Sequence, residues 1–118
     1  MSTDTAQTIE ATNQVFDHHL GAFAKGLDEL LKDYNENSVI VTPDKTYRGV
    51  TEIRGFFKAF LDGAQPAFWD AFKVTCKRTE GEIAYLAWEA KPFIEMATDT
   101  LYVRDGTIAV QTFTTLSA

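Results

Sequence analysis

One carboxyl group and one imidazole in this chain occupy positions where acid–base chemistry could take place. Asp99 alternates with Ala97, Leu101 and Val103 along a predicted strand, so its carboxyl shares a face that is otherwise suited to a core. Burial removes water from a carboxyl group, raises its pKa and can keep it protonated, so that it donates a hydrogen bond to a developing oxyanion. We predict a pocket role for Asp99. The alternative is a structural acid that bonds to backbone or to a helix end.

The two histidines of the chain are adjacent, at His18 and His19. On a helical wheel His19 lies at the edge of an apolar stripe that contains Phe16 and Leu20, whereas His18 points nearly the opposite way. An imidazole that faces a cavity can accept or donate a proton near pH 7. We predict that His19 faces the pocket; the alternative is a histidine at a solvent edge or a dimer edge.

Further residues are candidates for the wall of this pocket. Tyr34 continues the apolar stripe of a second predicted helix, so its hydroxyl either faces the pocket or is tied to a core neighbour. Gln111 and Phe113 share one face of the last predicted strand, where Gln111 could be a polar anchor for a ligand. The bulky candidates, each with plain core packing as the alternative, are Phe57, Phe60, Phe68, Trp69, Trp88 and Met96. Trp88 lies either in the pocket or at a dimer interface, because the pattern leaves open which face of the strand from Ile83 is concave.

Other chemistries have little support in the sequence. Neighbouring positions on a helix diverge by about 100°, so the two adjacent histidines cannot converge on one metal ion. No glycine-rich phosphate loop follows a predicted strand. Cys76 is the only cysteine and alternates with apolar residues of a strand, which is typical of packing rather than of a nucleophile. We therefore expect no metal and no cofactor.

Length and charge limit the class of protein. The 118 residues are 45% apolar, which suits one domain over residues 1–118, with a frayed tail over residues 1–5. A net charge of −6 disfavours nucleic acid and anionic lipid surfaces as partners. A lone cysteine fits a reducing compartment, and the polar start of the chain resembles no targeting peptide. We expect a cytoplasmic protein that does not enter a membrane.

The elements that position these residues follow from hydrophobic periodicity. Helical spacing covers residues 9–23 and 27–34, a short hairpin follows at 39–41 and 46–48, and a third helix runs from a cap at Thr51 to a C-cap at Gly63. Strands follow from Phe72, at 83–90, at 93–103 and at 108–116. Helices followed by a meander of strands indicate an α+β fold. The strand at 83–90 is apolar on both faces, so we predict that helices cover one face and a second subunit covers the other, in a homodimer through the sheet.

The order and spacing of four segments resemble a known family. They are LDELLKDYNENSVIVTPDKTYRG, IRGFFKAF, IAYLAWEA and TDTLYVRDGTIAVQTF. Over about residues 9–116 the chain resembles the nuclear transport factor 2-like superfamily, and within it the SnoaL-like and ketosteroid-isomerase-like small bacterial proteins. The resemblance implies a cone-shaped, curved antiparallel sheet wrapped around a long N-terminal helix, with a pocket at the open end and dimers through the sheet. Because members include isomerases, dehydratases, polyketide cyclases and assembly domains, it implies no single activity.

The resemblance also implies roles for individual residues. It places Asp99 where ketosteroid isomerases carry a neutral, hydrogen-bonding acid. It places His19 near their oxyanion-binding tyrosine if one residue is deleted before Leu27; without that gap His18 takes the position. Their general-base aspartate is replaced by Thr42, whose hydroxyl cannot shuttle a proton near neutral pH, so isomerisation by their mechanism is doubtful.

We therefore expect a small-molecule pocket protein. The first hypothesis is a cofactor-free lyase or isomerase that acts by acid–base chemistry on a small apolar or carbonyl-bearing substrate. In it His19 moves a proton, and Asp99 hydrogen-bonds the carbonyl oxygen or orients the imidazole. The alternative is a non-catalytic ligand-binding module or a dimeric assembly module of the same fold.

Overall fold

The computed structural model describes residues 2–117, with side chains from residue 6 onward. The helices are α1 (Ser2–Ala22), α2 (Leu27–Leu31), α3 (Gly49–Gly63) and α4 (Pro66–Ala71). The strands are β1 (Val39–Val41), β2 (Thr46–Arg48), β3 (Phe72–Glu80), β4 (Ile83–Ala90), β5 (Ile94–Arg104) and β6 (Thr107–Ser117). Because α1 begins at Ser2, it already includes residues 2–5, for which we expected a frayed tail; Met1 lies outside the described residues.

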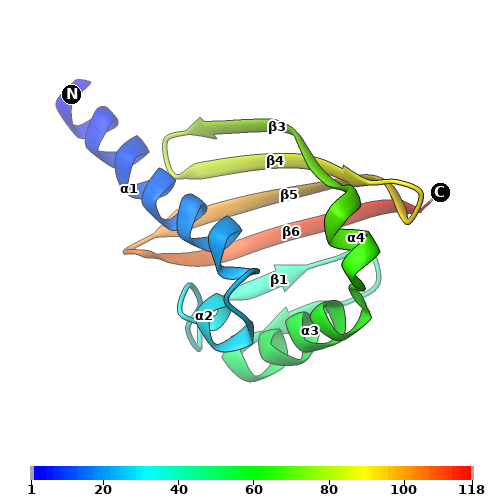
Figure 1. Cartoon of the computed structure of the whole chain (residues 1–118). Coiled ribbons are helices and arrows are strands. Elements are labelled where there is room, and N and C mark those ends of the chain that lie inside the picture. The colour runs from blue at the N-terminus through cyan, green and yellow to red at the C-terminus, as the bar shows by residue number, and fades with distance from the viewer. Residues whose placement is uncertain (1, 118) are drawn as a thin grey trace.

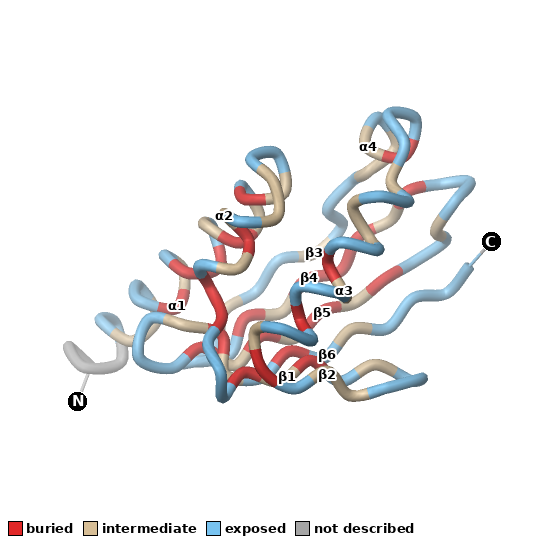
Figure 2. The backbone as a smooth tube through the Cα atoms, turned by 90° about the horizontal axis from the view of Figure 1, so that it is seen from below, coloured by how far each residue is buried: buried red, intermediate tan, exposed pale blue. Residues whose placement is uncertain are grey.

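All six strands form one curved sheet in the order β2-β1-β6-β5-β4-β3 (Figure 1). Strands β3 to β6 form an antiparallel meander, and β1 joins its edge parallel to β6, where Ile40 lies opposite Gln111. The four helices lie on one side of this sheet, and the buried residues of the two layers face each other (Figure 2). The expected α+β fold with a curved sheet is confirmed. None of the described helices is long and apolar enough to cross a membrane.

The core lies between the helices and the concave face of the sheet. Phe16 of α1, Ile53 of α3 and Leu101 of β5 are completely buried there. Thr12, one turn before Phe16, is also buried, and its hydroxyl donates a 2.7 Å hydrogen bond to the carbonyl oxygen of Gly81 in the β3–β4 turn. This bond ties the middle of α1 to the sheet, which positions the last turn of the helix.

The ends of α3 differ from those expected. The helix begins at Gly49 rather than after a cap at Thr51, because Gly49 adopts a φ of +81° that favours glycine and turns the chain out of β2. The backbone N–H of Arg48 donates to the Glu52 carboxylate, so a side chain from inside the helix satisfies its start. At the other end, Gly63 is the last helical residue and not a left-handed C-cap.

The end of the sheet beside the β4–β5 loop is irregular. The β3–β4 pairing shifts register after Val74, the β4–β5 pairing shifts after Trp88, and the β5–β6 pairing shifts after Ile94. Such bulges bend a strand and increase its twist. Helix α4, which was too short to predict from periodicity, covers this end, and its Phe68 packs edge-on against the Trp88 ring at 6.0 Å.

Candidate functional site

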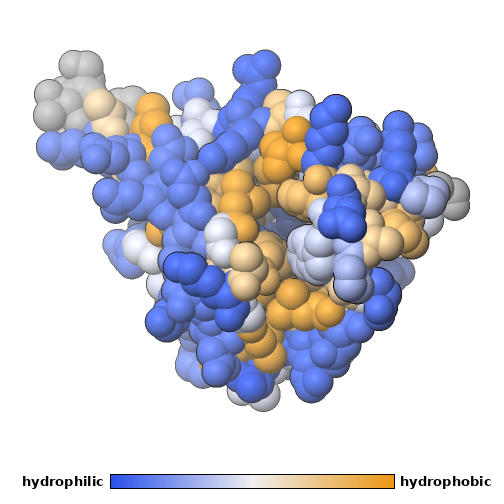
Figure 3. Space-filling view, in the orientation of Figure 1, coloured by the Kyte–Doolittle hydropathy of each residue, from blue (hydrophilic) through white to orange (hydrophobic). Residues whose placement is uncertain are grey.

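A cavity of about 120 Å³ lies between α1, α3 and α4 and the concave face of the sheet. Its wall is almost entirely apolar, and its polar side chains are His19 from α1, Asp99 from β5 and Gln111 from β6. A hollow bordered by hydrophobic residues is visible at the centre of the helical face of the molecule (Figure 3). The fold thus brings an imidazole, a carboxyl and an amide together in an otherwise apolar site.

Asp99 is buried, with 7% of its surface exposed, and its two oxygens accept different hydrogen bonds. Trp88 donates from its indole N–H to one oxygen at 2.9 Å, and Gln111 donates from its amide to the other at 2.9 Å. Burial raises the pKa of Asp99 to about 6, although both donors act to lower it. Because this value lies below 7, the carboxyl is mainly ionised at neutral pH, whereas the sequence suggested a neutral acid.

Gln111 connects this carboxyl to a buried tyrosine. The hydroxyl of Tyr34 donates to the amide oxygen of Gln111, whose amide nitrogen donates to Asp99. Burial raises the pKa of Tyr34, so its hydroxyl stays protonated and available as the donor. The hydrogen bond from Tyr34 therefore orients the Gln111 amide so that its nitrogen points towards the Asp99 carboxylate. Tyr34 itself does not belong to the described cavity wall, so it supports the site from behind rather than contacting a ligand.

His19 lies in an aromatic environment on the other side of the cavity. Its ring packs edge-on against Phe23, Tyr34 and Phe57, with centroid distances of 5.2, 6.2 and 6.1 Å. Burial, and to a smaller extent the charge of His18, lowers the pKa of His19 to about 4, so this imidazole is neutral at pH 7. Its Nδ1 atom is buried and has no hydrogen-bond partner among the described residues. A buried polar atom left unpaired costs about 1–3 kcal/mol.

No hydrogen bond joins His19 to Asp99 within the described part of the chain. The Asp99 oxygens accept from Trp88 and Gln111, while Nδ1 of His19 is unpaired. The suggestion that Asp99 orients the imidazole therefore has no support in this geometry. Both groups line one cavity, and they can cooperate only through a molecule that lies between them.

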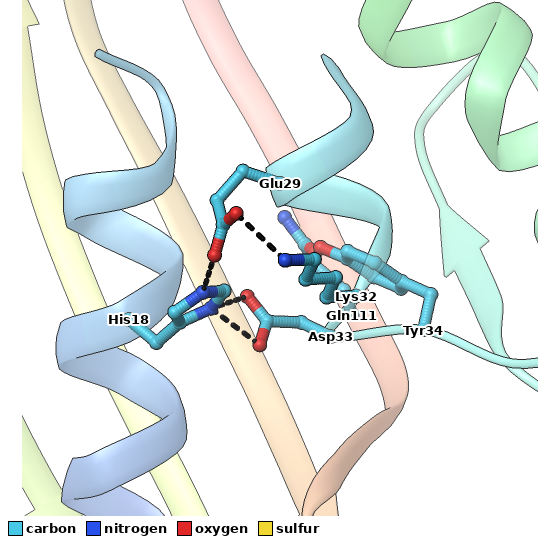
Figure 4. A network of polar contacts seen from close by, with 6 residues as sticks. All are labelled: His18, Glu29, Lys32, Asp33, Tyr34 and Gln111. Carbon is cyan, nitrogen blue, oxygen red and sulfur yellow. Dashed lines mark hydrogen bonds and ion pairs between the residues drawn. The ribbon is translucent and has the colours of Figure 1, made fainter. Parts of the chain in front are cut away.

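His18 takes a separate, structural position. Its Nδ1 lies 2.7 Å from a carboxylate oxygen of Asp33, and its Nε2 lies 2.6 Å from Glu29, which also pairs with Lys32 at 3.0 Å (Figure 4). The hydrogen bonds to Glu29 and Asp33 raise the pKa of His18, which favours its cation. His18 thus joins α1 to the segment around α2, and His19 is the histidine on the cavity wall, as we expected from the helical wheel.

Comparison with known proteins supports the fold and leaves the activity open. No family model and no curated protein matches the sequence. An NTF2-like protein of unknown function from Mesorhizobium loti matches the structure with a TM-score of 0.74 and 16% identity, over 92% of this chain and 93% of that one. The chain has the nuclear transport factor 2-like fold.

Two further structures with this fold have functional names. One from Kribbella flavida DSM 17836, assigned as a ketosteroid isomerase, matches with a TM-score of 0.71 and 14% identity, over 93% of this chain and 81% of that one. Another from Shewanella denitrificans OS-217, assigned as a SnoaL-like polyketide cyclase, matches with a TM-score of 0.68 and 16% identity, over 89% and 90% of the two chains. At such low identity these matches carry the nuclear transport factor 2-like fold and no activity.

Within this fold, most of the expected wall residues lie on the cavity. Those that line it are Phe57, Phe60, Trp69, Trp88, Gln111 and Phe113. Trp88 therefore faces the helices, which identifies its face of β4 as concave. Sequence reasoning missed Leu20, Phe23, Phe56, Phe72, Val74 and Leu86, which also line the cavity. The alternation of β4 gave a signal for Leu86, which shares a face with Trp88.

Other candidates lie elsewhere in the nuclear transport factor 2-like fold. Met96 is 50% exposed, because strand alternation turns it away from the face that carries Ala97 and Asp99. Phe68 is not part of this wall and lines a second hollow. Thr42 accepts hydrogen bonds from backbone N–H groups of the β1–β2 turn, so its hydroxyl serves that turn. Among the described residues, no group of three or more His, Cys, Asp or Glu side chains is arranged to hold a metal ion.

Proposed function

We propose that the cavity binds a small, largely apolar carbonyl compound and that the protein catalyses proton transfer on it without a cofactor, as an isomerase or lyase. One observation carries the proposal. Two ionisable side chains, His19 and Asp99, line a cavity whose wall is apolar apart from these two and Gln111, and His19 has an unpaired polar atom. Buried groups with shifted pKa values in a cavity are typical of catalytic sites.

The two pKa values exchange the roles that the sequence suggested. With a pKa of about 6, Asp99 is ionised at pH 7 and close to the value that suits a general base. With a pKa of about 4, His19 is neutral, so it is a weak base but can donate an N–H to a carbonyl oxygen. In the proposed step Asp99 removes a proton from the carbon beside the carbonyl. The electron pair moves onto oxygen as an enolate, the N–H of His19 stabilises it, and return of the proton at another carbon completes an isomerisation.

The size of the cavity limits the reacting part of the substrate. A cavity of about 120 Å³ is slightly smaller than an engineered apolar cavity of about 150 Å³ that binds benzene. The cavity therefore suits one six-membered ring. Cyclic ketones such as cyclohexanone and cyclohexenone combine that size with a hydrogen-bond acceptor.

A non-catalytic binding module is the second candidate. It is favoured by the hydrogen bonds of Asp99, since Trp88 and Gln111 already occupy both of its oxygens. A carboxylate held in this way can accept a further hydrogen bond from a ligand without removing a proton from it. The replacement of the expected aspartate by Thr42 agrees with this candidate.

One experiment separates the two candidates. Both tryptophans of the chain, Trp69 and Trp88, line the cavity, so intrinsic fluorescence reports binding of cyclohexanone. Conversion of cyclohex-3-enone to the conjugated cyclohex-2-enone is followed by ultraviolet absorbance. We expect Asp99→Asn to abolish conversion and retain binding, and Asp44→Asn, in an exposed turn, to retain both. Binding without conversion would select the binding module, and the absence of any binding would refute both candidates.

A homodimer through the sheet remains a proposal. On the outer face of the sheet Met96 of β5 pairs with Leu116 of β6, and their exposed fractions are 50% and 58%. A second copy that covers this face would bury these neighbouring side chains. Light scattering at micromolar concentration should give twice the chain mass, and Met96→Lys should reduce it to one. The expected cytoplasmic location likewise rests on the sequence.

A further inference from the structure

A second hollow of about 320 Å³, here called the outer hollow, lies beside the cavity. It is formed by the end of α3, the α3–α4 linker and the residues after the β4–β5 loop, and its wall comprises Ala59, Phe60, Gly63, Ala64, Gln65, Phe68, Phe93 and Ile94. No ionisable side chain is among them. The outer hollow therefore suits an apolar group.

The outer hollow and the cavity share one aromatic wall residue, Phe60. Phe60 lines both, and it packs edge-on against Phe68 with a centroid distance of 5.7 Å. Phe68 in turn contacts Trp88 on the cavity side at 6.0 Å and Phe93 on the outer side at 6.3 Å. Phe60 and Phe68 thus lie where the two hollows approach each other. Phe60 is only partly buried, and a phenylalanine side chain turns about two torsion angles, so its rotation can join the two spaces.

We propose that the ligand is an elongated molecule with a cyclic carbonyl head in the cavity and an apolar tail that passes Phe60 into the outer hollow. This inference rests on the proposed function, because it takes the head group from it. The cavity holds about one ring, whereas the outer hollow is a more open depression with an apolar wall. Phe60 then determines specificity, since its ring sets whether a tail can pass.

The outer hollow exists because three small residues, Ala59, Gly63 and Ala64, line the end of α3 and its linker. The backbone at Gly63 does not require glycine, because its φ is not positive, and an added Cβ would meet no atom within 4 Å. A larger side chain at position 63, which lines the outer hollow, can therefore be introduced without forcing the backbone to move. Gly55, two turns earlier on α3, has equally open surroundings and lines neither space.

The test compares cyclohexanone with 4-pentylcyclohexanone, with tryptophan fluorescence as the readout. If the tail is buried, affinity should rise by up to about fourfold for each methylene group. Gly63→Leu should remove this gain and leave the affinity for cyclohexanone unchanged, while Gly55→Leu should change neither. Phe60→Ala should increase the gain in affinity from the pentyl chain, because no phenylalanine ring then has to rotate to admit it. Circular dichroism spectra that match those of the unmodified chain confirm that the variants are folded.

Each other result has a defined meaning. If cyclohexanone binds and the pentyl chain adds nothing, the inference is wrong and the proposed function stands. If the gain survives Gly63→Leu, the tail lies elsewhere and the inference is again wrong. If neither compound binds to the unmodified chain, the proposed function itself fails.

Discussion

The buried carboxyl of Asp99 should make the stability of this protein depend on pH in a direction opposite to that of most aspartates. Burial raises its pKa from the ordinary value of 3.8 to about 6 in the folded chain. Between these values the folded chain holds a proton that the unfolded chain has lost. The contribution of Asp99 to stability is therefore complete below pH 3.8 and is lost as the pH rises to about 6.

The size of the effect follows from the two pKa values. A tenfold difference in proton affinity corresponds to about 1.4 kcal/mol, so the loss between pH 3.8 and neutral pH is about 3 kcal/mol. Asp99→Asn keeps the shape and removes the ionisation. Gln111 can turn its amide to accept from Asn and donate to Tyr34, which preserves the hydrogen-bonded chain. Relative to the unmodified protein, Asp99→Asn should therefore become more stable by about 3 kcal/mol as the pH rises from below 4 to above 7.

Urea unfolding at several pH values between 3.5 and 8, followed by circular dichroism, measures this difference. Contributions from other ionisable groups cancel, since they are the same in both chains. Trp88→Phe removes one hydrogen-bond donor from the Asp99 carboxylate and should raise the pKa of Asp99 further. The stability contributed by Asp99 should then be lost at a higher pH than in the unmodified chain. A stability difference between the unmodified chain and Asp99→Asn that is constant from pH 4 to pH 7.5 would show that the carboxyl is not desolvated, and the base role would fail with it.

Three further predictions concern other parts of the fold. His18→Ala leaves the buried carboxyl of Asp33 without its partner and should cost about 1–3 kcal/mol of unfolding free energy, whereas Glu29→Gln should cost less because Glu29 is more exposed; urea unfolding of both variants checks the order. Gly49→Ala should destabilise by about 1–2 kcal/mol, because φ is +81° and a carbonyl oxygen lies 3.2 Å from the added Cβ, and Gly55→Ala in the same helix should be neutral or stabilising; equal thermal shifts would contradict this. In NMR spectra the His19 ring should stay neutral down to about pH 5, and this group should destabilise the fold as the pH falls from 6.5 towards 4; a titration midpoint near 6.5 would show that the ring is hydrated.

The sequence predicted the faces on which side chains lie better than it predicted their chemistry. Period-two alternation indicated the inward face of Asp99, and helical spacing distinguished His19 from His18, because both patterns depend only on backbone geometry. The pKa values depend on which groups come close in space. Trp88 and Gln111 donate to Asp99 from neighbouring strands, and no local pattern gives that pairing.

Short or irregular segments were also beyond the sequence patterns. Helix α4 has six residues, too few to establish a helical period, and it provides Trp69 to the cavity. Phe23 was included in the predicted helix by its spacing, but in the structure it lies just past the end of α1, and its ring contacts His19. Such residues reach the site through tertiary packing, which overrides local preference.

The register shifts near the β4–β5 loop have a consequence for how proteins with this architecture can diversify. A slip of one residue in a regular ladder would carry Asp99 to the outer face. Here the shifts after Trp88 and after Ile94 lie between that loop and the carboxyl, so an insertion or deletion near Phe93 can be absorbed before it reaches position 99. The loop that borders the outer hollow can thus change in length while the acid keeps its place, so that the shape of the outer hollow and the position of the buried carboxyl can vary independently.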